Sequence, residues 1–125
     1  MIPLETIWLK NLEEGVLQFP RCQQCRAWSW YPLPMCKHCQ CVDTAWEEVA
    51  PTGRVYSWTR VYRNFSGYPM PVMPYIVGII EIDEASGVRI PCYYLGKQDL
   101  EPLVNAAVAL TPVRHEGRIF WGFDL

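Results

Sequence analysis

Residues 21–41 read RCQQCRAWSWYPLPMCKHCQC, and the interpretation of the whole chain starts from them. They hold two Cys-x-x-Cys pairs, Cys22 with Cys25 and Cys36 with Cys39, separated by ten residues. A pair at this spacing lies on a tight turn that points both sulfur atoms at one ion, and two such turns supply four tetrahedral thiolates. We therefore predict that the four cysteines bind one structural Zn²⁺ ion, while noting that four thiolates also suit iron.

Other uses of these cysteines fit the sequence less well. Two disulfides would need an oxidising compartment, yet the N-terminal residues MIPLETIWLK do not resemble a signal peptide. A thioredoxin-like redox pair would need a helix in a βαβ unit, and the Trp- and Pro-rich residues 28–34 do not fit one. His38 is an alternative ligand that we expect to face solvent, and Cys41 is an additional thiol outside the ligand set. A closed four-thiolate site leaves no open coordination position, which favours a structural role.

Composition sets further limits. The chain has 125 residues, 50% of them hydrophobic and 19% charged, so it is long and apolar enough to bury one core. The net charge of −2 disfavours a protein that coats nucleic acid. No apolar run approaches the roughly 20 residues of a membrane span. Free thiolates and the N-terminus together predict a reduced, cytoplasmic location.

The chain divides into three predicted parts. Residues 1–20 contain an amphipathic helix at residues 4–18, which Gly15 is expected to end or interrupt. This helix either packs on its own domain or docks on a partner. Residues 21–50 form the metal module and close with an acidic joint at residues 43–51. Residues 51–125 follow the turn signal Pro51-Thr52-Gly53.

The third part has the pattern of a small barrel. Strands are predicted at residues 54–63, 75–83, 88–95, 108–115 and 118–124, with a hairpin turn at residues 84–87 and an irregular loop at 64–74. A helical piece at residues 97–107 separates the third strand from the fourth. Five strands with a helix in this place are the order of an OB-fold, so the predicted class is mainly β.

The first of these strands contains the candidate binding surface. Its alternation places Val55 with Ser57 on one face and Tyr56 with Trp58 on the other, as one wide aromatic face. We predict a weak site formed by Arg54, Trp58, Arg60 and Arg63, because arginine over aromatic rings suits planar anions. The 3′-phospho-ADP part of CoA is one such ligand, and single-stranded nucleic acid is another. Ordinary barrel packing explains the same residues equally well.

A catalytic set is not recognisable. The two histidines, His38 and His115, belong to no Ser/His/Asp or Cys/His pattern. Cys92 lies in a strand between Pro91 and Tyr93, where a cysteine is more often a small core residue than a nucleophile. We therefore expect the isolated chain to be catalytically silent.

An ordered set of motifs along nearly the whole chain resembles a known family. Besides the two cysteine pairs, the set comprises Ile7-Trp8, Gly15, Pro32, Trp46, Thr52-Gly53-Arg54-Val55-Tyr56-Ser57, Pro74-Tyr75, Gly87-Val88-Arg89 and Gly96. The sequence resembles the acyl-CoA-associated proteins catalogued as domain of unknown function thirty-five, which join a rubredoxin-like zinc ribbon to an OB-fold. It departs from that family at Cys41, where Ser or Thr is usual, and at Asn105-Ala106, where an Ile-Gly pair is usual.

The resemblance implies a partner and no reaction of the chain's own. Members are typically small subunits or fused domains of thiolase-superfamily enzymes, including thiolases, acyltransferases and steroid side-chain retro-aldolases. It thus implies a hetero-oligomer with a thiolase-fold subunit, with acyl-CoA near the interface and the reacting residues in the partner. The alternatives are a stand-alone OB-fold module that binds single-stranded nucleic acid and an iron-loaded electron carrier.

Overall fold

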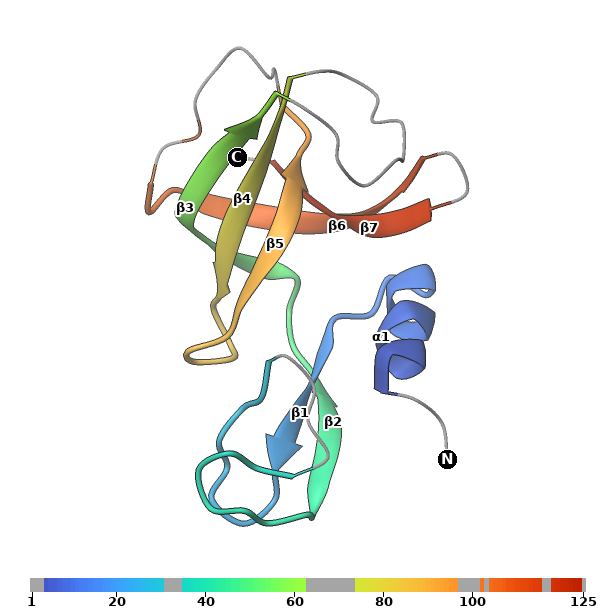
Figure 1. Ribbon diagram of the computed structural model, residues 1–125, viewed down its shortest axis with the longest axis vertical. Helices are drawn as coiled ribbons and strands as arrows, with labels where there is room; N and C mark the ends of the chain where they lie inside the picture. The colour runs from blue at the N-terminus through green and yellow to red at the C-terminus, as the bar shows by residue number, and fades with distance from the viewer. Residues whose placement is uncertain are drawn as a thin grey trace.

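The computed structural model describes residues 4–30, 35–62, 74–96, 102, 104–115 and 118–124. Helix α1 (Leu4–Glu13) precedes seven strands: β1 (Gln18–Cys22), β2 (Thr44–Glu48), β3 (Thr52–Val61), β4 (Tyr75–Ile82), β5 (Arg89–Tyr94), β6 (Ala107–His115) and β7 (Arg118–Asp124). The molecule is elongated, with a barrel at one end, the β1–β2 sheet at the other and α1 alongside (Figure 1). Within these residues, no helix is long and apolar enough to cross a membrane.

The five C-terminal strands form a closed barrel in the order β3-β4-β5-β7-β6, which β6 closes by pairing with β3. The pairs are antiparallel except β5 with β7, which is parallel. This confirms the OB-like barrel and its predicted strands. Its interior is filled by apolar side chains that alternate along the strands, including Val55, Ile76, Ile80, Ile90, Val108, Leu110, Trp121 and Phe123.

Strand β3 contains a β-bulge that disturbs its two faces. Its register with β4 shifts between Val55 and Ser57. Tyr56 and Ser57 are both exposed, whereas Trp58 is partly buried and packs against the core. The prediction that Tyr56 and Trp58 share one aromatic face is therefore wrong, because the extra residue of a bulge breaks the strict alternation from which that face was read.

A second, two-stranded sheet joins the metal module to the barrel. Strand β1 pairs antiparallel with β2, from Gln18 opposite Glu48 to Cys22 opposite Thr44. The interpretation of residues 43–51 as an acidic joint missed β2, and β1 runs across the boundary placed between residues 20 and 21. Five-residue strands carry too little periodicity to be recognised alone, and this pairing joins segments far apart in the sequence.

Helix α1 packs on its own chain. Leu12 is 2% exposed, and the helix contacts β7. The helix ends at Glu13, earlier than predicted, and Gly15 follows with φ of +74°. A left-handed residue one position past the helix cap, here Glu14, is a common helix stop, as expected for this glycine. Of the two predicted roles of α1, the structure shows packing within the chain.

Several predicted features fall wholly or partly outside the residues that the structure describes: the loop at residues 64–74, residue Arg63 and most of the helical piece at residues 97–107. In the described part of that last segment, Val104 and Asn105 form a turn, and β6 already begins at Ala107. The hairpin turn before β5 is confirmed, with Gly87 at φ of +82°.

Candidate metal centre

The four cysteines of the two pairs meet at the end of the β1–β2 sheet. The sulfur atoms of Cys22 and Cys39 are 3.5 Å apart, and those of Cys25 and Cys36 are 3.6 Å apart. All four sulfur atoms lie within 4.8 Å of one another. A tetrahedral site with Zn–S bonds of about 2.3 Å places its sulfur atoms about 3.8 Å apart. The four side chains, called the tetrathiolate cluster below, therefore have the dimensions of a four-thiolate metal site.

Both cysteine pairs adopt the same turn. The residue after each pair, Arg26 in the first and Gln40 in the second, has a left-handed backbone with φ of 64° and 61°. The N–H of Arg26 donates to the carbonyl of Cys22 at 3.0 Å, and the N–H of Gln40 donates to that of Cys36 at 2.8 Å. Each turn is thus closed on itself, which fixes the direction of its two sulfur atoms.

The electrostatics of the cluster favour a bound cation. The N–H of Cys25 lies 3.4 Å from the sulfur of Cys22 and is the main reason that the pKa of Cys22 is lowered to about 6. The Cys41 N–H lowers the pKa of Cys39, but burial and the three other cluster sulfurs together raise that pKa to about 12. Thiolates at this spacing repel one another, so a cation between the four sulfur atoms would stabilise their ionised form.

A charged network ties the first turn to strand β2. The Glu47 carboxylate accepts a hydrogen bond from the Gln23 amide at 3.1 Å and lies 3.2 Å from the Arg26 guanidinium and 3.6 Å from that of Arg21. The Gln23 hydrogen bond, followed by the charges of the two arginines, lowers the pKa of Glu47. The Arg21 guanidinium also lies 4.5 Å from the Trp28 ring centroid. This network braces the cysteine turn from outside.

The other predicted ligand candidates stay outside the cluster. His38 is exposed, as expected. The sulfur of Cys41 lies 3.3 Å from the N–H of Asp43 and is not among the four that converge. Four protein sulfurs complete a tetrahedron, so the arrangement suits a structural ion and offers no free coordination position for a substrate.

The predicted binding residues do not form one surface. Arg54 is exposed opposite Glu81, and its guanidinium donates to the carbonyl of Asn105 at 3.0 Å. Trp58 and Arg60 lie beyond the bulge, partly buried, with the Arg60 guanidinium 5.6 Å from the Trp58 ring centroid. The structure therefore separates Arg54 from this pair, while Arg63 lies outside the described residues.

Arg54 borders a surface hollow that the sequence did not predict. The hollow measures about 430 Å³ and is lined by Arg54, Val55, Tyr56, Glu81 and Asn105. Next to it, the Arg89 guanidinium lies 4.1 Å from the Tyr56 ring centroid and 3.1 Å from the Glu81 carboxylate.

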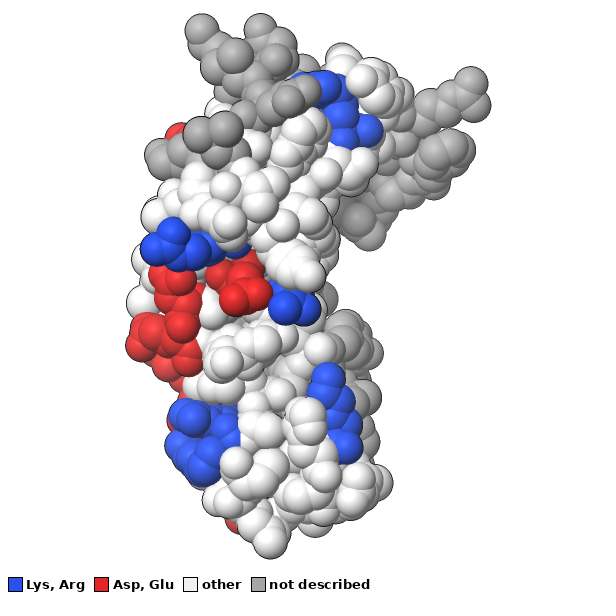
Figure 2. All heavy atoms as spheres, turned by 90° about the vertical axis from the view of Figure 1, so that its left-hand side faces the viewer, with Lys and Arg blue, Asp and Glu red and all other residues white. Residues whose placement is uncertain are grey.

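Basic and acidic side chains gather side by side on this side of the molecule (Figure 2). Arg89 was missed because only the register of the β4–β5 hairpin, in which it faces Glu81, brings it to β3. In the sequence, only the exact bounds of these two strands could have indicated that Arg89 lies opposite Glu81.

Cys92 is a core residue, as predicted. Its side chain is 2% exposed inside the barrel, and burial raises the pKa of its thiol. A thiol that resists ionisation is a poor nucleophile. Among the described side chains, we find no cysteine or histidine arranged for acyl transfer.

The comparisons with known proteins agree with this architecture. Residues 10–40 match the family model described as the ChsH2 rubredoxin-like zinc ribbon domain, and residues 46–112 match the ChsH2 C-terminal OB-fold domain. The chain is 32% identical to a probable enoyl-CoA hydratase alpha subunit of Thermomonospora curvata over 79 residues, which are 63% of its length. The matched part is 24% of that relative, so the chain corresponds to about a quarter of its length.

Two solved structures are similar over 98% of this chain. One is the Ltp2-ChsH2(DUF35) aldolase; the match covers 95% of that chain with a TM-score of 0.81 and 25% sequence identity. The other, a DUF35-family protein of unknown function from Sulfolobus solfataricus, is covered over 85% with a TM-score of 0.65 and 17% identity, which shows the fold alone. On the strength of both domain models, this chain belongs to the ChsH2 family of zinc-ribbon and OB-fold proteins.

Proposed function

We propose that the chain is a non-catalytic subunit that binds a thiolase-like partner and helps it act on acyl-CoA thioesters. The observation that carries this proposal is the similarity, over nearly the whole chain, to a chain of an Ltp2–ChsH2 aldolase. The relative named as an enoyl-CoA hydratase subunit adds a second link to CoA thioesters. The reaction itself, whether condensation, cleavage or transfer, would belong to the partner, because the described side chains of this chain include no catalytic arrangement.

We further propose that the tetrathiolate cluster holds Zn²⁺ as a structural ion. The sulfur spacing and the family model of a zinc ribbon support this ion, and a cytoplasmic location would keep the thiols reduced. Zn²⁺ would hold the two cysteine turns together and would supply no chemistry to a substrate. Metal analysis of the purified chain distinguishes Zn²⁺ from iron. Visible absorption is a second test, because an iron-loaded four-thiolate site is coloured and a zinc site is not.

The hollow beside Arg54 is the proposed contact for the partner or for the phosphates of CoA. The Arg54 guanidinium has donors beyond the one used by the Asn105 carbonyl, and arginine binds phosphate and carboxylate groups in a bidentate manner. Trp58 and Arg60, on the other side of the bulge, would line a separate, more buried part of any acyl path.

Nucleic-acid binding is the less favoured alternative. OB-folds that bind single strands present several aromatic rings on one face. In this chain the bulge in β3 places Tyr56 outside and turns Trp58 towards the core. The net charge of −2 also lacks the basic excess of such modules.

Co-purification tests the proposal. We expect the tagged chain, expressed in its own host, to retain a thiolase-fold protein in fixed stoichiometry, and we expect turnover of acyl-CoA thioesters by the pair but not by the chain alone. Arg54→Ala should weaken the pair or raise its KM for acyl-CoA, whereas Arg114→Ala, an exposed arginine on β6, serves as the control. Turnover by the chain alone, or salt-dependent binding of single-stranded oligonucleotides without such a partner, would contradict the proposal.

A further inference from the structure

Three aromatic side chains connect the metal centre to helix α1. Trp30 comes from the segment between the two cysteine pairs, Phe19 from β1 and Trp8 from α1. The ring centroids of Trp8 and Trp30 are 4.5 Å apart, those of Trp8 and Phe19 are 5.5 Å apart, and those of Phe19 and Trp30 are 5.7 Å apart. Each ring of this aromatic cluster touches the other two, so a displacement of one changes the packing of both others.

The place of Trp30 depends on the folded metal module. The preceding residue, Ser29, is 3% exposed, and its N–H donates to the carbonyl of Pro20 in β1 at 2.9 Å. In the sequence, the segment that carries Trp30 begins at one metal-ligand candidate, Cys25, and ends at another, Cys36. Structural zinc sites of this kind supply the folding energy of their module, so the segment loses its fixed position when the ion leaves.

Helix α1 is short and depends on its contacts with the rest of the chain. It has ten residues, and isolated helices shorter than about 12–15 residues are marginal in water. Leu12 anchors the C-terminal end of the helix in the core. A groove of about 150 Å³ lies between the helix, with Trp30, and strands β5 and β7; from the helix it is lined by Trp8, Leu9 and Leu12, and Leu9 is 49% exposed.

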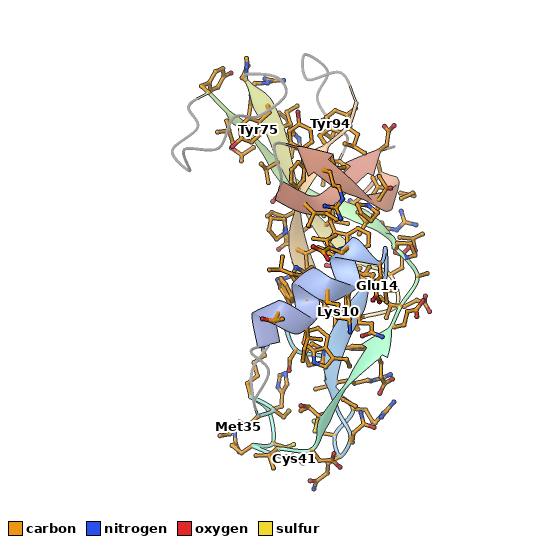
Figure 3. The ribbon with its side chains drawn as sticks, turned by 90° about the vertical axis from the view of Figure 1, so that its right-hand side faces the viewer. Lys10, Glu14, Met35, Cys41, Tyr75 and Tyr94 are labelled. Carbon is orange, nitrogen blue, oxygen red and sulfur yellow. The ribbon has the colours of Figure 1, made fainter. Side chains whose placement is uncertain are left out.

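The side view shows where helix α1 lies relative to the metal module and the barrel. Helix α1 lies across the middle of the molecule, with the exposed side chain of Lys10 on it and that of Glu14 just past its end, and Met35 and Cys41 mark the far tip of the metal module (Figure 3). The helix therefore lies where the metal module and the barrel meet, and Trp8 joins it to the first of these through the aromatic cluster.

We propose that metal binding at the tetrathiolate cluster holds helix α1 against the barrel through Trp30, and that loss of the metal releases the helix and opens the apolar groove beneath it. The coupling is a property of this chain alone and does not depend on the proposed partner. It makes the presence of the ion a switch for the shape of the surface between α1 and strands β5 and β7.

Hydrogen exchange of the full, Zn²⁺-loaded chain tests the coupling. The amides of residues 8–13 are the readout, because the first four N–H groups of a helix have no partner within it. In the Trp30→Ala variant we expect these amides to exchange about 5- to 150-fold faster than in the natural chain, which is the usual range of coupling between linked sites. Metal analysis should show one ion still bound to this variant. Trp28→Ala is the matched control, since Trp28 lies in the same segment and its ring packs on the Arg21 guanidinium, whereas the ring pairs of the aromatic cluster are those of Trp8, Phe19 and Trp30.

Three further variants keep the test decisive. If Trp30→Ala binds no metal, Trp30→Phe, which keeps a smaller ring in the aromatic cluster, takes its place. Coupling is reciprocal, so Trp8→Ala should lower the apparent affinity for Zn²⁺ by the same factor, measured by competition with a chromophoric chelator. Leu9→Ala, on the half-exposed side of the helix, should leave it unchanged. Equal helix exchange in the Trp30 and Trp28 variants, or equal affinity in the Trp8 and Leu9 variants, would overturn the proposal.

Discussion

Replacing Cys36 with serine probes the four-thiolate site at one of its two buried ligands. Cys36 is fully buried, and its sulfur lies 3.6 Å from that of Cys25. A serine hydroxyl fits the same space but does not ionise near neutral pH, so the variant offers three thiolates instead of four. We expect loss of the metal at chelator concentrations that the natural chain withstands.

The size of the effect follows from the number of ligands. Structural Zn²⁺ sites bind with apparent free energies of about 10–16 kcal/mol at pH 7. An equal share among the four cysteines is about 2.5–4 kcal/mol for each, and every 1.4 kcal/mol is about tenfold in affinity. Cys36→Ser should therefore weaken the apparent affinity for Zn²⁺ by about 60- to 700-fold, and the loss of folding energy should lower the melting temperature.

Competition with a chromophoric chelator, together with metal analysis, measures this change. The matched control is Cys41→Ser, because Cys41 is close in sequence but does not join the cluster. Wild-type affinity in the Cys36 variant would refute the four-thiolate assignment. An equal loss in the Cys41 variant would refute the choice of ligands.

Three further predictions concern single positions. Asn105 has a left-handed backbone (φ 71°), so Asn105→Gly should leave thermal stability unchanged or raised, while Asn105→Ala should cost about 1 kcal/mol in chemical denaturation. Gly78→Ala places a Cβ 2.6 Å from the Phe123 ring and should lower the free energy of unfolding by about 1–3 kcal/mol. Adding Phe123→Leu, which removes the ring, should recover part of that stability. The lowered pKa of Glu47 means that its carboxylate stabilises the fold above the ordinary carboxyl range and stops doing so as the pH falls through the lowered value. Glu47→Gln should thus lower the melting temperature at pH 7 and differ less from the natural chain in acid, while Glu48→Gln should have little effect; a difference that does not depend on pH would contradict the assignment.

The metal ligands and the class of fold could be predicted because their signals are local. Two residues between paired cysteines are enough to set the turn, and Cys22, Cys25, Cys36 and Cys39 indeed converge. The barrel strands were recognised because each has six or more residues of strand-like sequence and turn residues such as Gly87 separate them. The core position of Cys92 was predicted because a cysteine within a strand is more often a small core residue than a nucleophile.

What the sequence left open depends on pairing between distant segments. The bulge at Val55–Ser57 appears only in the register of β3 with β4, and it divides the predicted aromatic face by turning Trp58 inward. Strand β2 and the Arg89–Tyr56 contact also exist only through partners elsewhere in the chain.

The sequence by itself therefore determined the metal-binding turns and the five-stranded barrel, because each is specified by residues close together in the chain. Tertiary structure alone decided that Trp30 of the metal module meets Trp8 of the helix, and that Arg54 stands apart from Trp58. The physical reason is the same in both cases. Which side chains touch across elements depends on strand register and helix placement, and these are fixed only when the whole core packs.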